Sequence, residues 1–181
     1  IEHRVQLAKS KFVVTDATNR PKLDEVQDCP PIISVVPASG FELPEGDLDF
    51  WNEVNAQSNQ CDVVMMQIDD PFLLMFTSGT TGLAKPLAVP LKALIAFGRY
   101  MQDAVGLTEE DAFWNIADPG WAYGLYYAIT GPLLLGHATL FYEGGFSTES
   151  LIKITQEYNI TNLAGAPTAY RLMMAADPDQ M

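Results

Sequence analysis

Short apolar runs alternate with segments of helical periodicity along this chain. Runs rich in β-branched and aromatic residues are typical of strands buried on both faces of a parallel sheet. We predict strands at residues 12–15, 32–36, 73–76, 112–117, 138–142 and 162–165.

Apolar side chains at helical spacing predict the helices between these strands. The opening residues 1–7 already follow an amphipathic helical pattern, and Pro90 suits the first turn of a helix that ends before Gly106. In the segment after Tyr123, the pair Gly131-Pro132 should bend or interrupt the helix. Ser147 or Thr148 is a suitable N-cap for the next helix. The helices that we predict are residues 50–57, 90–105, 123–135, 147–158 and 167–176.

The alternation of strands and helices predicts the α/β class, with a mostly parallel sheet flanked by helices. At 181 residues the chain is long enough to form one α/β domain. Residues 37–70 are rich in acidic and small polar residues, and we expect them to form a surface excursion whose carboxylates face solvent. We expect residues 71–181 to form the core that carries the functional chemistry.

A segment rich in glycine and hydroxyl side chains follows the predicted strand at residues 73–76. Its composition suits an anion site, because glycine lets backbone N–H groups approach phosphate and lysine adds positive charge. It does not fit a Walker A loop, because Ala84 precedes the lysine and Pro86 follows it, and it contains no G-x-G-x-x-G. The alternative is a polar surface loop without a ligand. The segment reads Thr77-Ser78-Gly79-Thr80-Thr81-Gly82-Leu83-Ala84-Lys85.

Two further segments also follow predicted strands directly: Ala117-Asp118-Pro119-Gly120-Trp121-Ala122-Tyr123-Gly124 and Gly165-Ala166-Pro167-Thr168-Ala169-Tyr170-Arg171. Ligands of open α/β sheets bind at loops beyond the carboxyl ends of the strands. We therefore expect all three segments to lie at one edge of the sheet.

These three segments resemble, in order and spacing, motifs of the adenylate-forming enzymes, which include acyl-CoA synthetases, luciferases and peptide-synthetase adenylation domains. The second and third are most similar to stretches of acetyl- and medium-chain acyl-CoA synthetases. The resemblance implies a part of the large N-terminal domain of such an enzyme. It also implies a ligase that uses ATP, Mg²⁺ and CoA to convert a carboxylic acid into an acyl-AMP and then a thioester. The C-terminal domain of the same parent chain would be its partner, and the isolated chain should be inactive.

The resemblance also implies roles for single residues. The glycine-rich segment would hold the ATP phosphates through Thr77, Ser78, Gly79, Thr80, Thr81, Gly82 and Lys85. The acyl pocket and the CoA channel would be bordered by Trp121, Ala122, Tyr123, Gly165, Ala166, Pro167 and Thr168. The resemblance places no catalytic residue and no metal ligand in this chain.

Several positions leave alternatives open. Trp121 and Tyr123 could be packing aromatics. Asp118 could cap a turn or orient substrate, and Arg171 could contact phosphate or lie on a helix surface. Pro86 stands where the family usually has glycine, and it biases Lys85 toward extended backbone.

Charge and composition restrict the classes of binding partner that this chain can have. The chain has 10 Lys and Arg against 23 Asp and Glu, a net charge of -13, which argues against nucleic acid or an anionic membrane as partner. No apolar stretch is long enough to span a membrane, and Cys29 and Cys61 suggest free thiols in a cytoplasmic protein. Two other functions stay open: an adenylation domain that loads a carrier protein, and a non-catalytic phosphate-binding module with a decayed loop.

Overall fold

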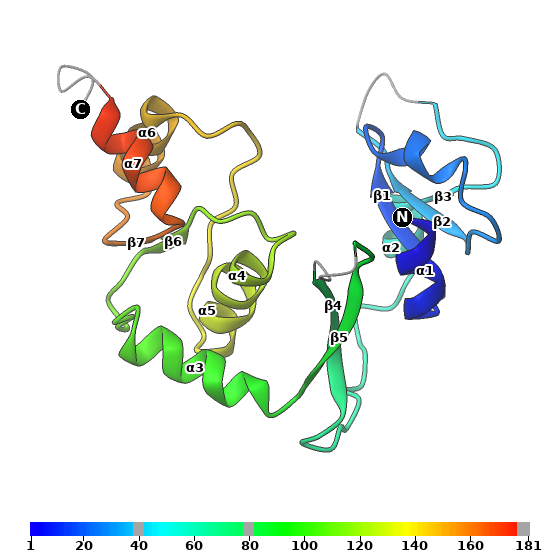
Figure 1. The fold of residues 1–181 in the computed structure, drawn as a ribbon, viewed down its shortest axis with the longest axis horizontal. Coiled ribbons are helices and arrows are strands. Elements are labelled where there is room, and N and C mark those ends of the chain that lie inside the picture. Colours follow the sequence, from blue (N-terminus) through cyan, green and yellow to red (C-terminus); the bar gives the residue numbers. More distant parts are fainter. Residues whose placement is uncertain (38–41, 78–81, 177–181) are drawn as a thin grey trace. The chain divides into compact units, whose positions relative to one another are not determined.

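The computed structural model describes residues 1–37, 42–77 and 82–176. The chain divides into two compact units, Ile1–Val89 and Pro90–Met181, which are described separately (Figure 1). Parallel strands and covering helices confirm the predicted α/β class. The division into a surface excursion and a core beginning at residue 71 stays a prediction.

The first unit contains a small parallel sheet of three strands. The sheet order is β1-β2-β3, with Val13 opposite Ile32 and Ile33 opposite Leu48. The predicted opening helix and the first two predicted strands are confirmed, whereas the 3₁₀ helix and β3 were not predicted. The elements are α1 (Glu2–Ala8), β1 (Val13–Asp16), a 3₁₀ helix (Arg20–Leu23), β2 (Ile32–Val35), β3 (Leu48–Asp49) and α2 (Phe50–Asn55).

A buried ion pair ties the 3₁₀ helix to the sheet. Arg20 donates to both carboxylate oxygens of Asp47, with Nε–Oδ2 and Nη2–Oδ1 distances of 2.7 and 2.9 Å. The Ser34 hydroxyl donates to the same carboxylate at 2.5 Å, and the Asp47 side chain is only 3 % exposed. The expectation that acidic residues of segment 37–70 face solvent is therefore wrong for Asp47, because Arg20 and Ser34 replace its hydration.

The glycine-rich segment connects two strands that pair with each other. These are β4 (Pro71–Thr77) and β5 (Lys85–Pro90), which form a separate two-stranded sheet. The strand at 73–76 is confirmed, but β5 was not predicted. In the described residues β4 pairs with β5, and β6 pairs with β7. The expectation that all three motif segments follow strands of one sheet is therefore wrong for the glycine-rich segment. Pairing with the next segment along the chain closes a short loop, which costs little chain entropy.

The second unit has helices on both faces of a pair of parallel strands. β6 (Phe113–Asn115) and β7 (Asn162–Ala164) pair with Phe113 opposite Asn162. Figure 1 shows α6 and α7 on one side of these strands and α3, α4 and α5 on the other. The helices are α3 (Ala93–Asp103), α4 (Ala122–Gly124), a π-helix (Leu125–Thr130), α5 (Gly131–Leu134), α6 (Thr148–Glu157) and α7 (Pro167–Ala175).

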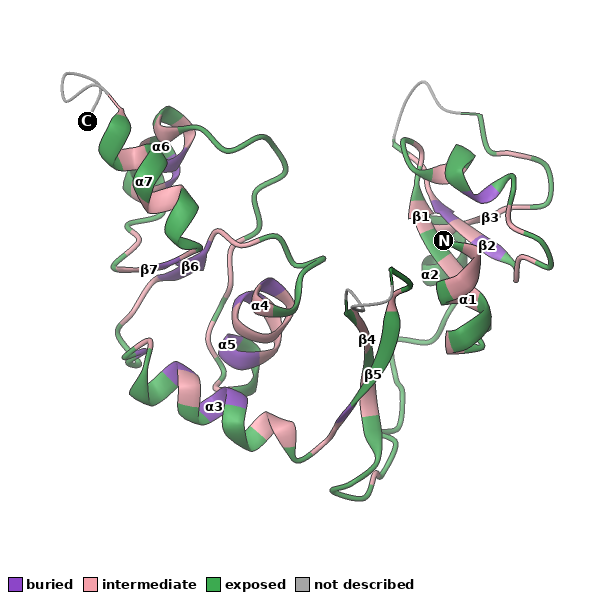
Figure 2. Cartoon of the chain, in the orientation of Figure 1, coloured by how far each residue is buried: buried purple, intermediate pink, exposed green. Residues whose placement is uncertain are grey.

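Side chains alternate between the two faces of this strand pair and form two cores. On one face Phe113 and Ala164 pack with Met101 and Leu107, and Met101 is fully buried. On the other face Trp114 packs with Leu151 and Ile154 of α6, and Leu163 and Met173 border that cluster. Figure 2 shows the buried positions concentrated on these inner surfaces. The apolar strand pattern therefore reflects burial on both faces.

The remaining predicted helices are confirmed. The helix that begins after Trp121 changes to a π-helix directly before Gly131-Pro132. This agrees with the predicted interruption. Pro132 has no N–H to donate, so regular α-helical hydrogen bonding cannot continue through it. Ser147 is the N-cap of α6, and its hydroxyl accepts a bond from the Ser150 N–H at 3.0 Å. The prediction of a strand at 138–142 is wrong. That run pairs with no strand in the described residues, and Thr139 instead donates to the Ala128 carbonyl.

Candidate functional site

The glycine-rich segment is described only at its two ends. Thr77 is the exposed last residue of β4, and Lys85 is the exposed first residue of β5. Gly82 has a φ of +88°, a conformation that side chains with a Cβ rarely adopt. Ser78, Gly79, Thr80 and Thr81 lie outside the described residues. The extended backbone at Lys85 agrees with the bias expected from Pro86.

Helix α1 lies against β4 and against the residue that precedes β5. The His3 Nε2 atom lies 3.1 Å from the carbonyl oxygen of Ala84, the residue before Lys85. The Arg4 guanidinium lies 5.8 Å from the ring centre of Phe76, the residue before Thr77. Both residues were overlooked in the sequence, where nothing separated them from an ordinary amphipathic helix.

A compact turn after β6 positions the second motif segment. The Asp118 carboxylate accepts a bond from the Gly120 N–H at 2.7 Å, so the turn-capping interpretation of Asp118 is confirmed. The Trp121 N–H donates to the Asp118 carbonyl at 3.1 Å. A Cβ on Gly124 would lie only 2.1 Å from that same carbonyl oxygen, so this turn requires glycine at position 124.

The third motif segment begins where β7 passes close to β6. A Cβ on Gly165 would lie 2.6 Å from Cγ1 of Ile116, so glycine is required for this close approach. Pro167 then occupies the first turn of α7, where its missing N–H costs nothing. The Tyr170 hydroxyl donates to the Leu163 carbonyl at 2.9 Å and ties α7 back to β7. Arg171 is exposed on α7, as expected for a helix-surface residue.

The second and third segments border one cavity of about 760 Å³ within the second unit, and we call it the motif cavity. The volume lies within the range of small-molecule sites. Six of the predicted site residues line it: Trp121, Tyr123, Gly165, Ala166, Pro167 and Thr168. The predicted site residue Ala122 is exposed and does not line it. Trp121 is 73 % exposed, so it is not a core aromatic.

Several residues of the motif cavity were not predicted from the sequence. Ile116 directly follows β6, Leu172 lies on α7, and Phe146 precedes α6. Tyr100 comes from α3, which the sequence marked only as a core helix. An aromatic residue three positions after Phe97 was the only available signal, and it is equally typical of packing.

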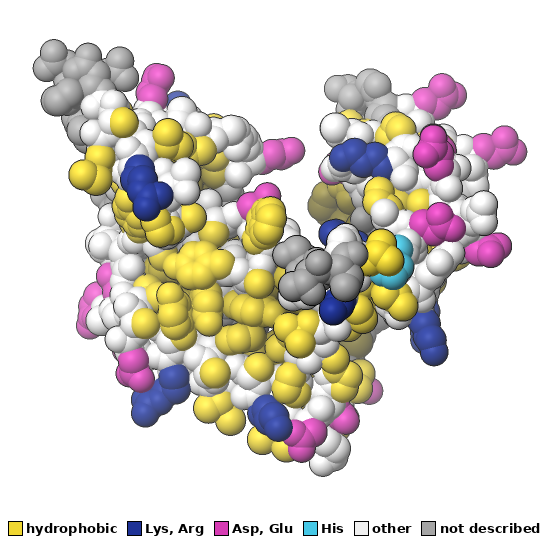
Figure 3. Space-filling view, in the orientation of Figure 1, with side chains coloured by type: hydrophobic (Ala, Val, Ile, Leu, Met, Phe, Trp, Pro, Cys, Tyr) yellow, Lys and Arg dark blue, Asp and Glu magenta, His cyan; other side chains and the backbone are white. Residues whose placement is uncertain are grey.

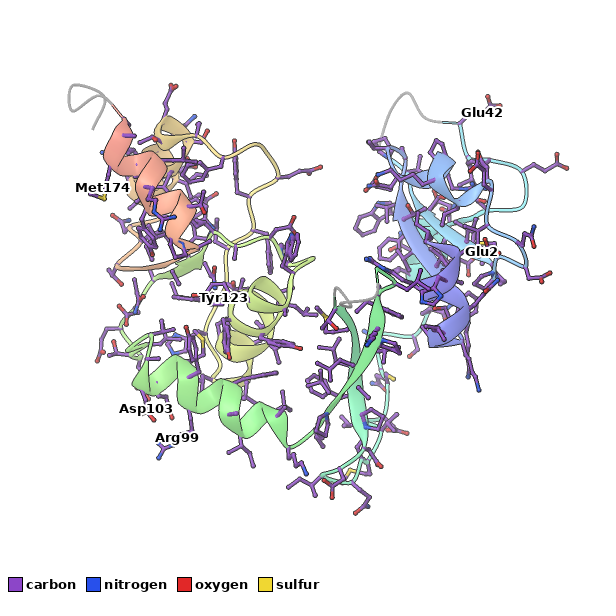
Figure 4. All side chains as sticks on the ribbon, in the orientation of Figure 1. Glu2, Glu42, Arg99, Asp103, Tyr123 and Met174 are labelled. Carbon is purple, nitrogen blue, oxygen red and sulfur yellow. The ribbon has the colours of Figure 1, made fainter. Side chains whose placement is uncertain are left out.

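The motif cavity is largely apolar and has no lysine or arginine among its lining residues. Its one carboxylate, Asp118, is engaged with the Gly120 N–H. Burial, together with the hydroxyl of Tyr100, raises the pKa of Tyr123 to about 12. Figure 4 shows Tyr123 on the side of α4 that faces β6 and β7, and Figure 3 shows hydrophobic side chains gathered over this part of the second unit. The cavity therefore suits an uncharged, mainly apolar group.

Metal ligation finds no support in the described part of the chain. Over residues 1–37, 42–77 and 82–176, no three His, Cys, Asp or Glu side chains gather closely enough to hold an ion. None of the helices within those same ranges is long and apolar enough to cross a membrane.

Comparison with known proteins decides the family. The model of the AMP-binding enzyme family matches residues 1–181. This chain belongs to the AMP-binding enzyme family. The resemblance noted in the motifs is thereby confirmed over the whole chain.

Individual AMP-binding relatives agree with this result. The acetyl-coenzyme A synthetase of Bacillus subtilis is 31 % identical in an alignment 180 residues long, which covers 97 % of this chain and 31 % of that enzyme. The crystal structure of an acyl-CoA synthetase from Brucella canis is 52 % identical, with a TM-score of 0.92 over 99 % of this chain and 32 % of that one. The chain thus spans about a third of the length of these relatives.

A more distant structure supports the fold alone. An anthranilate CoA ligase in complex with anthranoyl-AMP is 18 % identical to this AMP-binding chain, with a TM-score of 0.86. The match covers 98 % of this chain and 35 % of that one. The arrangement of helices and strands is therefore shared with a protein of very different sequence.

Proposed function

We propose that this chain contributes to an ATP-dependent acyl-CoA synthetase that activates a small to medium-chain carboxylic acid. In the first step a carboxylate oxygen attacks the α-phosphorus of ATP, which yields acyl-AMP and releases pyrophosphate. In the second step the thiol of CoA attacks the acyl carbon, a thioester forms, and AMP leaves. The proposal rests on the apolar motif cavity, bordered by two family motifs in a chain 52 % identical to an acyl-CoA synthetase.

The motif cavity is the proposed site of the acyl group and of the adjoining part of CoA. Its lining offers no cation to bind a carboxylate or a phosphate, so the charged parts of the substrates would lie outside it. Tyr123 and Trp121 would border the acyl group, and Gly165 to Thr168 would border the channel through which the thiol approaches. The exposed Ala122 would have a role only through its backbone.

The glycine-rich segment is the proposed phosphate site. The exposed Lys85 would place a positive charge beside the pyrophosphate that leaves. Gly82 has a positive φ, which suits a residue without a side chain. Thr77, Ser78, Gly79, Thr80 and Thr81 would add hydroxyl and backbone donors. Mg²⁺ would accompany ATP as its counter-ion, but the described residues offer it no ligand set, and we assign it no step. A cytoplasmic location and a C-terminal domain as partner stay predictions.

The proposal is tested on the full-length protein with ATP, CoA and straight-chain acids from acetate to octanoate. We expect acid-dependent release of pyrophosphate and loss of free CoA thiol. Gly79→Ala and Thr80→Val should abolish most of the activity, and Lys85→Met should lower it. Pyrophosphate release without thiol loss would indicate transfer to a carrier protein instead. No pyrophosphate with any acid, and no heat on titration with ATP, would indicate a non-catalytic module and contradict the proposal.

A further inference from the structure

Tyr100 is a cavity residue that lies outside every family-like motif of this chain. It lies on α3, and its ring stacks on the ring of Tyr127 in the π-helix, with centroids 4.0 Å apart and planes at 27°. Tyr100 lines the motif cavity, whereas Tyr127 does not. The position of the Tyr100 ring is thus fixed from behind by a partly buried aromatic residue.

Tyr123 is held by the same partner. Its ring meets that of Tyr127 edge to face, with centroids 5.4 Å apart, and it also lines the motif cavity. Tyr127 therefore braces two cavity-facing rings that come from different helices, and we call Tyr100, Tyr123 and Tyr127 the tyrosine cluster. Aromatic pairs of this geometry are more favourable than their buried area alone predicts.

The Tyr100 hydroxyl influences the ionisation of Tyr123. Burial is the largest cause of the raised pKa of Tyr123, and the Tyr100 hydroxyl is the next. The Tyr100 hydroxyl therefore disfavours ionisation of Tyr123, and the two rings, which come from α3 and α4, both line the motif cavity.

The other residues that line the motif cavity show which part of a substrate Tyr100 and Tyr123 would meet. Ile116, Ala117, Pro167 and Leu172 line the same cavity and present only apolar side chains. An alkyl chain gains from each methylene that it buries there, until it meets a wall that does not move. Two rings that both pack against the partly buried Tyr127 form such a wall.

We propose that Tyr100 is a specificity-determining residue, which holds the Tyr123 ring in place and thereby limits the length of the acyl chain that the motif cavity accepts. The inference rests on the proposed function for the reaction in which acids of different length are compared. The preference of the cavity for binding acids of a given length does not depend on that reaction. It gives α3, which no motif marks, a direct part in substrate choice.

Selectivity between acids of different length is the deciding measurement. In the full-length protein, kcat/KM is measured for straight-chain acids of four to twelve carbons in the wild type and in Tyr100→Leu, Tyr100→Phe and Tyr126→Phe. Tyr126 is the matched control, because it stacks on Phe97 at 4.5 Å in the same aromatic region but does not line the cavity. The ratio between long and short acids separates a change of the wall from a general loss of folding.

We expect Tyr100→Leu to raise the ratio of long-chain to short-chain kcat/KM by about tenfold or more, the discrimination typical of one methylene in an apolar pocket. The change should arise mainly in KM. Tyr100→Phe, which removes only the hydroxyl, should cause a smaller shift in the same direction, and Tyr126→Phe should cause none. Equal changes for all acids, or an equal shift in Tyr126→Phe, would overturn the inference.

Two readouts do not depend on turnover. Spectrophotometric titration of the wild type should show that Tyr123 ionises above the ordinary pKa of tyrosine, and Tyr100→Phe should lower that pKa only in part, because burial is the larger cause. Calorimetric binding of the same acids should show the same change in length preference. A shift in binding without pyrophosphate release in the wild type would refute the proposed reaction and keep the inference. Normal turnover in the wild type, with a length preference that Tyr100→Leu leaves unchanged, would support the proposed reaction and refute the inference.

Discussion

Gly165 and Ile116 lie so close together that a Cβ on Gly165 would be 2.6 Å from Cγ1 and 2.9 Å from Cδ1 of Ile116. The two residues follow β7 and β6, and both line the motif cavity. Their contact therefore joins the ends of the two parallel strands and forms part of the cavity wall. Any side chain at position 165 must displace the Ile116 side chain or separate the strands.

Gly165→Ala should destabilise the protein, because overpacking of this kind costs about 1–3 kcal/mol. Ile116→Ala in the same molecule removes both clashing atoms and should restore part of the loss. Gly145→Ala is the matched control, because a Cβ there meets nothing within 4 Å. Urea unfolding of the three variants is the measurement. Equal stability of Gly165→Ala and Gly145→Ala would contradict the steric argument.

Gly124→Ala should be more damaging than the same change at Gly98. At position 124 the new Cβ would meet backbone atoms of Asp118 at 2.1 and 2.5 Å, which no side-chain movement relieves, and we expect a loss of about 3 kcal/mol or more. At position 98, in α3, the nearest atom is 3.4 Å away, and the gain in helix propensity, up to about 1 kcal/mol, should prevail. Thermal unfolding of both variants tests this order, and the reverse order would exclude it.

Arg20→Met should be strongly destabilising, because it leaves the Asp47 carboxylate buried without its cation. Breaking a buried ion pair in this way costs about 3–5 kcal/mol. Replacing both partners, as Arg20→Met with Asp47→Leu, should recover much of that loss. Arg99→Met is the control: the Arg99–Asp103 pair is 71 and 68 % exposed at a distance of 3.9 Å, and such pairs contribute at most about 1 kcal/mol. Similar denaturation midpoints for Arg20→Met and Arg99→Met would show that the Asp47 site is hydrated.

Asp111 should make stability depend on pH in the acid range. Hydrogen bonds from the Thr108 N–H and from the Thr161 and Thr108 hydroxyls lower its pKa from 3.8 to about 2. Because the folded pKa is lower than the unfolded one, this contribution is fully present above pH 4 and is lost as the pH falls toward 2.

The variant Asp111→Asn should therefore be less stable than the wild type at pH 6, and the difference should shrink steadily between pH 4 and pH 2. Urea unfolding at several pH values gives both curves. Glu110→Gln, a change of the same size in the next residue, should keep the pH dependence of the wild type. Parallel curves for Asp111→Asn and the wild type would show that these hydrogen bonds do not favour the charged form.

Local sequence was sufficient wherever an element depends on its own residues. The apolar run before the glycine-rich segment predicted β4, Ser147 predicted the start of α6, and Gly131-Pro132 predicted an irregular helix. The run at 138–142 shows the limit of such reasoning. It has the composition of a strand, but a strand forms only where a neighbour supplies hydrogen bonds, and no described strand lies beside it.

The sequence by itself determined the α/β class, the family motifs and six of the residues that line the motif cavity. Residue type and spacing encode these features, and each motif is continuous along the chain. Only the tertiary structure decided that β4 pairs with β5, that Asp47 is buried against Arg20, and that Tyr100 of α3 lines the same cavity as Tyr123 of α4. Local residue type and spacing do not specify the partner in any of these contacts, and the packing of the folded chain selects it from many of equal propensity.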